Sequence, residues 1–214
     1  MAKLVQKSGY IKSGKASGYM RYIATREGVE KLAGNGAVTK GQRELIQKLL
    51  TDFPDAVELF EYEDYCKTPT LGTASAFISM ALDANLHEID SESGYMQYIA
   101  TRPRVQKRGT HGLFSSATAV DLASAMSELE AHEGNVWTII YSLRREDAAR
   151  LEYDNADAWR TLLMENAPAL AKSMKISLDN FHWYAAFHNE GHHPHIHMMV
   201  WSDDPKEGFL TKDG

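Results

Sequence analysis

The chain has 214 residues, of which 43% are hydrophobic, and this is enough to bury the core of one domain. It contains no apolar run of 18 residues and only one cysteine, Cys66, so we expect a cytoplasmic protein without membrane insertion or an intrachain disulfide. Its net charge of −6 argues at first against a nucleic-acid partner, because phosphate binding depends on clustered Lys and Arg.

The charge is segregated along the chain, however. Residues 1–48 carry ten Lys or Arg and three Asp or Glu. Residues 49–101 carry one Lys or Arg and ten Asp or Glu. Four more cations follow within residues 102–108. Basic stretches of this kind can still steer a polyanion to one face of the molecule.

The first predicted elements are a strand over residues 4–11 and a short helix within residues 17–26, with Ser17 before it. The segment SGYMRYIATR of residues 17–26 recurs over residues 93–102 as SGYMQYIATR, identical at nine of ten positions. Two copies are too few for a solenoid, which needs three or more stacked units.

The repeat places tyrosine near arginine. At helical spacing, Tyr22 and Arg26 stand one turn apart on one face, as do Tyr98 and Arg102. A tyrosine oxygen is a poor nucleophile near its ordinary pKa of about 10. A neighbouring guanidinium that stabilises the phenolate or a target phosphate is therefore what a tyrosine nucleophile needs. The alternative is that the tyrosines, including Tyr19, simply pack the helix on a sheet.

Between the two copies, apolar residues at helical spacing predict a helix over residues 39–53, with Thr39 as its N-cap, and another over residues 73–82. These elements indicate a helical insertion in the N-terminal half. The acidic run between them is interpreted as a solvated face; its residues are Glu58, Glu61, Glu63 and Asp64.

After the second copy, a long amphipathic helix is predicted over residues 115–132, closed by Gly134. Arg144 and Arg145, further on, are placed either to meet phosphate or to make surface ion pairs. The order of elements predicts an α+β fold with helices packed on an antiparallel sheet. The elements that complete it are a strand over 136–142, a helix over 156–174, and strands over 181–188 and 196–201.

The last two strands predict a hairpin that carries five of the nine histidines within ten positions. His195 and His197 share one face of their strand, because residues two apart project to the same side. His188 ends the partner strand, where a turn of about six residues brings it level with them. Three imidazoles with an open fourth position are typical of a catalytic metal site. The alternative, a histidine-rich surface turn, is assigned to His192 and His193.

Residues 188–197, HNEGHHPHIH, resemble the third motif of the HUH-type relaxases of the MobP and MobL groups. In that motif an upstream histidine precedes a Pro-His-x-His strand by this spacing. Residues 22–28, YIATREG, look like their first motif, a Tyr-Ile pair near the amino terminus that leads into Arg-Glu-Gly. The order of the motifs also matches, and the resemblance covers nearly the whole chain.

The resemblance implies an HUH-type, palm-like antiparallel sheet with metal-binding histidines on its central strands and the tyrosine helix over them. It also implies site- and strand-specific nicking of DNA at a transfer origin, in conjugation or mobilisation of a plasmid or integrative element. Transesterification through tyrosine leaves a 5′-phosphotyrosyl intermediate. The implied partners are single-stranded DNA and relaxosome accessory proteins in a bacterial cytoplasm.

The resemblance also assigns roles to single residues. The ligands of a divalent ion, manganese or magnesium with zinc as an alternative, would be His188, His195 and His197. The implied catalytic residues are the nucleophile Tyr22, the neighbouring Arg26 and the proton-handling Glu190. The alternative nucleophiles, by local sequence, are Tyr98, Tyr19 and Tyr95.

We expect residues 1–214 to form a single relaxase domain, as the N-terminal part of a longer protein. Two other functions fit parts of the sequence. A three-histidine metalloenzyme acting on a small molecule would explain the histidines and leave the tyrosine repeat as packing. A non-catalytic DNA-binding remnant would keep the fold and lack the nicking activity.

Overall fold

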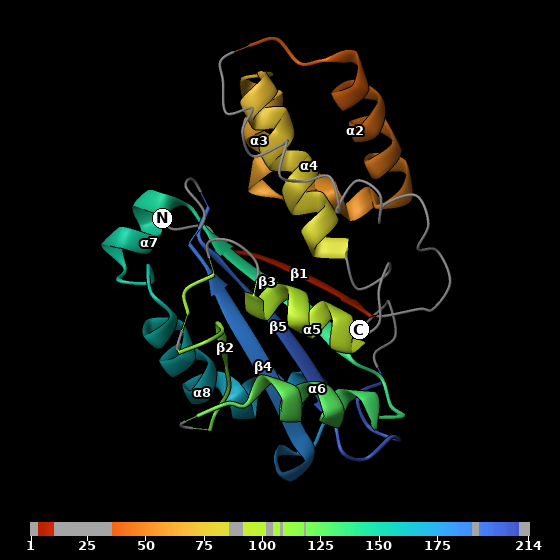
Figure 1. Cartoon of the computed structure of the whole chain (residues 1–214), viewed down its shortest axis with the longest axis vertical. Coiled ribbons are helices and arrows are strands. Elements are labelled where there is room, and N and C mark those ends of the chain that lie inside the picture. Colours follow the sequence, from red (N-terminus) through yellow and green to blue (C-terminus); the bar gives the residue numbers. More distant parts are fainter. Residues whose placement is uncertain are drawn as a thin grey trace. The chain divides into compact units, whose positions relative to one another are not determined.

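The computed structural model describes residues 4–10, 36–85, 92–101, 105–107, 109–117, 119–189 and 193–209. The chain divides into two compact units. The first comprises Met1–Ile11 and Ser91–Gly214, and the second comprises Lys12–Asp90. Figure 1 labels the α-helices and strands of both units.

The first unit is built on a five-stranded antiparallel sheet with the strand order β1-β3-β5-β4-β2 (Figure 1). Its strands are β1 (Leu4–Tyr10), β2 (Leu113–Phe114), β3 (Trp137–Leu143), β4 (Phe181–His188) and β5 (His195–Ser202). β5 is the central strand, and it pairs with β3 on one side and with β4 on the other. The predicted α+β class, with histidines on central strands, is confirmed.

One face of this sheet is apolar and packs against α8 (Ala156–Ser173). α8 begins where Asn155 caps it, since the Asn155 side-chain oxygen accepts a hydrogen bond from the Ala158 N–H at 2.9 Å. Trp159 of α8 lies in the same buried cluster as the alternate residues of β5. Those β5 residues are Ile196, Met198 and Val200. These alternate side chains therefore face the core, on the side of β5 away from His195 and His197.

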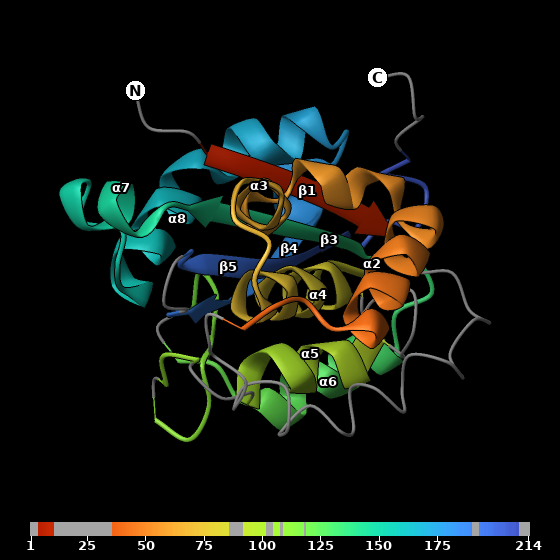
Figure 2. The ribbon, with the colours of Figure 1, turned by 90° about the horizontal axis from the view of Figure 1, so that it is seen from above.

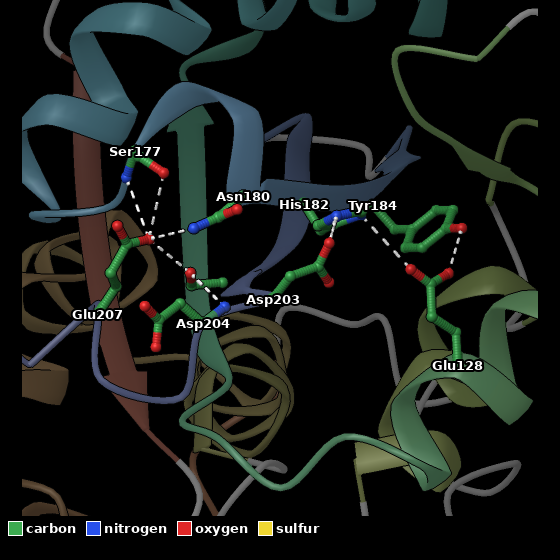
Figure 3. Close-up of polar contacts among 9 residues, drawn as sticks. Glu128, Ser177, Asn180, His182, Tyr184, Asp203, Asp204 and Glu207 are labelled. Atoms are coloured by element: carbon green, nitrogen blue, oxygen red, sulfur yellow. Dashed lines mark hydrogen bonds and ion pairs between the residues drawn. The ribbon is translucent and has the colours of Figure 1, made fainter.

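The opposite face carries polar as well as apolar side chains, among them Tyr184 and Met199, and lies against α5 (Glu92–Thr101) and α6 (Leu122–Glu130). Figure 2 shows these two helices on the side of the sheet away from α8. Glu128 of α6 accepts a hydrogen bond from Tyr184 Oη at 2.9 Å (Figure 3). Burial, as the main cause, and this hydrogen bond, as the second, raise the pKa of Tyr184 to about 12. The phenol therefore stays protonated at neutral pH and ties α6 to β4.

The prediction of one long helix over residues 115–132 is wrong for the first half of that range. Only α6 forms, because Asp121 caps it by accepting a hydrogen bond from the Ser124 N–H at 2.8 Å. Upstream, residues 115–117 and 119–121 are not helical. There Arg160 of α8 donates to the carbonyl of Ser115 at 2.8 Å and so occupies an acceptor that a helix would use. The periodicity also does not predict the short helices α7 (Arg145–Arg150) and η5 (Leu178–Asn180).

The second unit is helical, with α2 (Lys40–Asp52), the 3₁₀ helix η3 (Pro54–Glu58), α3 (Phe60–Lys67) and α4 (Leu71–Asn85). A capping box starts α2: Thr39 Oγ1 accepts from the Gln42 N–H at 3.1 Å, and Gln42 Oε1 accepts from the Thr39 N–H at 3.0 Å. The predicted helical insertion and its cap are thus confirmed. The acidic run is not wholly solvated, because α3 packs on α4 and Glu61 is buried. Among the described helices of the chain, none is long and apolar enough to cross a bilayer.

Glu207 lies just beyond β5 and fastens the segment that precedes β4. Its carboxylate accepts hydrogen bonds from Ser202 Oγ at 2.7 Å, Ser177 N at 3.2 Å and Asn180 Nδ2 at 3.2 Å (Figure 3). These hydrogen bonds lower the pKa of Glu207, and the bond from Ser202 has the largest effect. A lowered carboxylate pKa contributes stability that is present above the unfolded-state pKa and is lost as the pH falls through the folded-state pKa.

Glu207→Gln is therefore expected to lower the midpoint of thermal unfolding at neutral pH, because an amide oxygen accepts weaker hydrogen bonds than a carboxylate. The difference from the wild type should shrink as the pH falls below the ordinary glutamate pKa of 4.5. Circular dichroism melting curves across this pH range would measure it. A difference that does not change with pH would contradict the expectation.

Candidate metal centre

Three histidine side chains converge on the face of β4 and β5 that lies away from α8. His188 of β4 pairs directly with His195 of β5, and His197 lies two residues further along β5 on the same face. One nitrogen from each imidazole lies within 4.8 Å of the other two. None of the three residues is more than 2% exposed. The structure therefore brings them together as the sequence spacing predicts, in a group that could hold a metal ion.

In the neutral form that metal binding requires, a backbone carbonyl decides which ring nitrogen carries the proton in two of the three histidines. His188 Nε2 donates to the carbonyl of Ile99 at 2.8 Å, and His195 Nδ1 donates to the carbonyl of His193 at 2.9 Å. Because a carbonyl can only accept, the lone pair is on Nδ1 of His188 and on Nε2 of His195. A buried donor that loses its acceptor costs about 1–3 kcal/mol, so both contacts resist rotation of the rings.

His197 makes its hydrogen bond with a tyrosine of the repeat. Tyr95 Oη of α5 lies 3.0 Å from His197 Nδ1, and both side chains are fully buried. When Nε2 of a histidine binds a cation, Nδ1 carries the proton, and Tyr95 would then accept this hydrogen bond. The second ring nitrogens of the three histidines, His188 Nδ1, His195 Nε2 and His197 Nε2, are all buried. A set of three imidazole nitrogens suits a divalent transition metal.

The structure describes only some of the other predicted site residues. Tyr95 and Tyr98 belong to α5, which confirms the helix predicted for the second copy of the repeat. α5 begins at Glu92, so Ser93 lies within the helix rather than before it. The side chain of Tyr98 lies outside the described part of the chain. So do all atoms of Tyr19, Tyr22, Arg26 and Glu190.

The surface position predicted for His193 is wrong. This residue is 4% exposed, and its carbonyl accepts the hydrogen bond from His195. The next residue, Pro194, accepts a hydrogen bond from the Leu143 N–H at 3.1 Å, which packs the end of the turn against β3. His192 lies outside the described residues.

Two further polar residues lie near the histidines: Ser142, which the sequence does not single out, and Arg145, which it offers either for phosphate or for surface ion pairs. Ser142 of β3 lies opposite His195, and its buried hydroxyl has no hydrogen-bond partner within the part of the chain that the structure describes. Arg145 donates to Asn189 Oδ1 at 2.7 Å, one residue beyond His188. Strand pairing places Ser142 there, and no local sequence signal reveals it.

Comparison with known families agrees with this geometry. The family model described as MobL relaxases matches residues 1–214, which is the whole chain. No curated protein and no solved structure matches the chain. The histidine group on central antiparallel strands is consistent with the fold that the resemblance implies. The chain belongs to the MobL family of relaxases.

Proposed function

We propose that this relaxase is a metal-dependent DNA strand transferase that nicks one strand at a transfer origin through a tyrosine. Membership of the family supports a DNA relaxase in general. The finer proposal is supported by three buried imidazoles whose nitrogens lie within 4.8 Å of one another. The reaction serves mobilisation of a plasmid or integrative element in a bacterial cytoplasm, with accessory proteins. Residues 1–214 act in it as one domain.

The metal ion would be held by His188 Nδ1, His195 Nε2 and His197 Nε2. Manganese is the favoured ion and zinc the alternative, because imidazole suits transition metals whereas magnesium prefers oxygen ligands. When bound, the ion would draw negative charge from an oxygen of the scissile phosphate. The protein fixes the three rings in advance, so that little reorganisation is needed during the reaction. Ser142 offers a buried hydroxyl that can donate to a phosphate oxygen beside His195.

Tyr22 supplies the nucleophile in this proposal. Its phenol oxygen forms a bond to phosphorus while the bond from phosphorus to the 3′ oxygen breaks. The phenol proton passes to a base, for which Glu190 is the candidate, and the departing 3′ oxygen takes up a proton. Arg26 lies one predicted helical turn away and offers positive charge to the phenolate or the phosphate. The 5′-phosphotyrosyl product keeps the bond energy for later rejoining.

Tyr95 is not the nucleophile, although its hydroxyl lies beside a proposed ligand. The residue is 0% exposed and is hydrogen-bonded to His197 Nδ1, whereas Nε2 would bind the ion. These two nitrogens lie on different edges of the imidazole ring, so the phenol lies at the edge away from the nitrogen that would hold the ion. A nucleophile has to come within about 3–3.5 Å of the reacting atom, which this position does not favour.

Arg145 is proposed to contact a DNA phosphate next to the histidines, since its guanidinium already meets Asn189 beside His188. Arg145→Ala is expected to weaken binding of single-stranded DNA. The slope of log K against log salt should fall in magnitude by about 0.7, the value for one phosphate contact on single strands. Fluorescence anisotropy titrations at several salt concentrations would measure both changes.

Arg150→Ala is the matched control for this prediction. Arg150 lies on the same helix, α7, and its guanidinium pairs with Asp147 at 2.6 Å on an exposed surface. This variant should keep the wild-type affinity and salt slope. Equal losses in the two variants would contradict a specific phosphate contact at Arg145.

One assay separates the proposed function from its two rivals. The full chain is incubated with manganese and labelled single-stranded oligonucleotides from its own genetic element, and the products are separated under denaturing conditions. A covalent protein–DNA adduct supports nicking through tyrosine. Binding without an adduct identifies a DNA-binding remnant, and the absence of both favours an enzyme that acts on a small molecule.

A further inference from the structure

The second copy of the repeat contacts two of the three histidines. Both contacts come from α5: Tyr95 Oη lies 3.0 Å from His197 Nδ1, and the Ile99 carbonyl lies 2.8 Å from His188 Nε2. Tyr95 and Ile99 are four residues apart and 0% exposed, so they lie on one buried face of the helix. A single helix face therefore meets one histidine on each central strand.

The contact with His188 uses the carboxyl-terminal end of α5. Ile99 lies in the last turn of this helix, where carbonyls have no partner within the helix. His188 satisfies the Ile99 carbonyl, and the Gly112 N–H satisfies the Ala100 carbonyl at 2.8 Å. The carboxyl-terminal end of a helix carries partial negative charge, which favours a cation nearby. The carbonyl that orients His188 thus belongs to an end of α5 that favours a divalent ion.

Tyr95 takes the place of the usual hydrogen-bond partner of a metal-binding histidine. Such a histidine normally donates its second ring nitrogen to a carboxylate, a carbonyl or water, and losing that partner weakens metal binding about 10- to 100-fold. Here the partner is a phenol oxygen. The two rings meet edge to face, with centroids 6.2 Å apart and planes at 76°. Packing and hydrogen bonding therefore hold Tyr95 and His197 in one relative orientation.

We infer that α5 orients the metal ligands His188 and His197 without itself binding the ion, and that Tyr95 is a positioning residue for His197. This inference rests on the proposed metal site. It gives the two copies of the repeat different tasks, although their sequences are nearly identical. The second copy orients ligands through Tyr95 and the Ile99 carbonyl, while the first copy supplies Tyr22 as nucleophile.

The test is the affinity of the full chain for Co²⁺ without DNA, followed by the visible absorption of the bound ion, which reports the geometry of its ligands. Tyr95→Phe keeps the ring and removes only the hydroxyl. It should weaken Co²⁺ binding about 10- to 100-fold and change the absorption spectrum. Tyr184→Phe is the matched control, because it also removes a phenol hydroxyl on the same sheet face, one that bonds Glu128 rather than a histidine. It should keep the wild-type affinity and spectrum.

Each outcome of this experiment decides something. Unchanged affinity and spectrum in Tyr95→Phe, beside a wild type that binds Co²⁺, would overturn the inference and leave the metal site standing. Failure of the wild type to bind Co²⁺ would overturn the metal site and the inference together. An equal loss in Tyr184→Phe would assign the effect to general destabilisation and would also overturn the inference. Circular dichroism of the metal-free variants checks that both are folded.

Discussion

His195→Ala is expected to abolish both metal binding and DNA nicking. The His195 side chain pairs across the strands with His188 and is two residues from His197, so its loss leaves only two imidazoles for the ion. Loss of a hydrogen-bond partner outside the ligands costs about 10- to 100-fold in metal affinity, and loss of a ligand itself should exceed this range. Calorimetric titration with Mn²⁺ and the adduct assay would measure the two effects.

His182→Ala is the matched control, because His182 lies on the same face of β4 as His188. It hydrogen-bonds Asp203 Oδ2 at 2.7 Å (Figure 3). Its ring stacks on Trp201, and it is not one of the three grouped histidines. This variant should bind manganese and nick DNA like the wild type. Wild-type nicking by His195→Ala, in protein that circular dichroism shows to be folded, would contradict the proposed role of the three rings.

Tyr22→Phe is expected to eliminate the covalent adduct and to leave metal binding unchanged. The substitution removes the oxygen that attacks phosphorus and nothing that would hold the ion. Loss of a nucleophile can cost on the order of 10⁶-fold in rate, so the adduct should fall below detection. Denaturing electrophoresis of the adduct, with mass spectrometry of the phosphotyrosyl peptide from the wild type, would measure this.

The repeat supplies its own controls for the nucleophile. Tyr98→Phe should keep the adduct, and the reverse pattern would move the nucleophile to the second copy. Tyr95→Phe should form less adduct at low manganese and regain it at high manganese, because weaker metal binding can be overcome by mass action. Excess metal cannot restore a missing nucleophile, so this response separates a positioning residue from an attacking one.

The histidine hairpin could be predicted because its determinants are local. His195 and His197 alternate with Ile196 and Met198, and this period of two decides which residues face the core. The turn between the strands is short enough to bring His188 level with His195, and the pairing in the structure agrees. The capping box at Thr39 is local in the same sense, and it too was predictable.

The remaining parts of the site depend on contacts between distant segments. Ser142 lies opposite His195 only because β3 pairs with β5, and no pattern within β3 specifies that partner. Tyr95 is 102 residues from His197 in the sequence, and the repeat alone could not show what its second copy packs against. The helical periodicity alone does not place the start of α6, because Asp121 caps the helix and the Ser115 carbonyl upstream is bonded to Arg160 of the distant α8.

Anomalous diffraction from crystals of the manganese-loaded full chain would locate the ion directly. We expect one anomalous peak at bonding distance, roughly 2 Å, from His188 Nδ1, His195 Nε2 and His197 Nε2. Protein that has bound manganese but shows its peak at other residues, or at other nitrogens of these rings, would contradict the proposed centre.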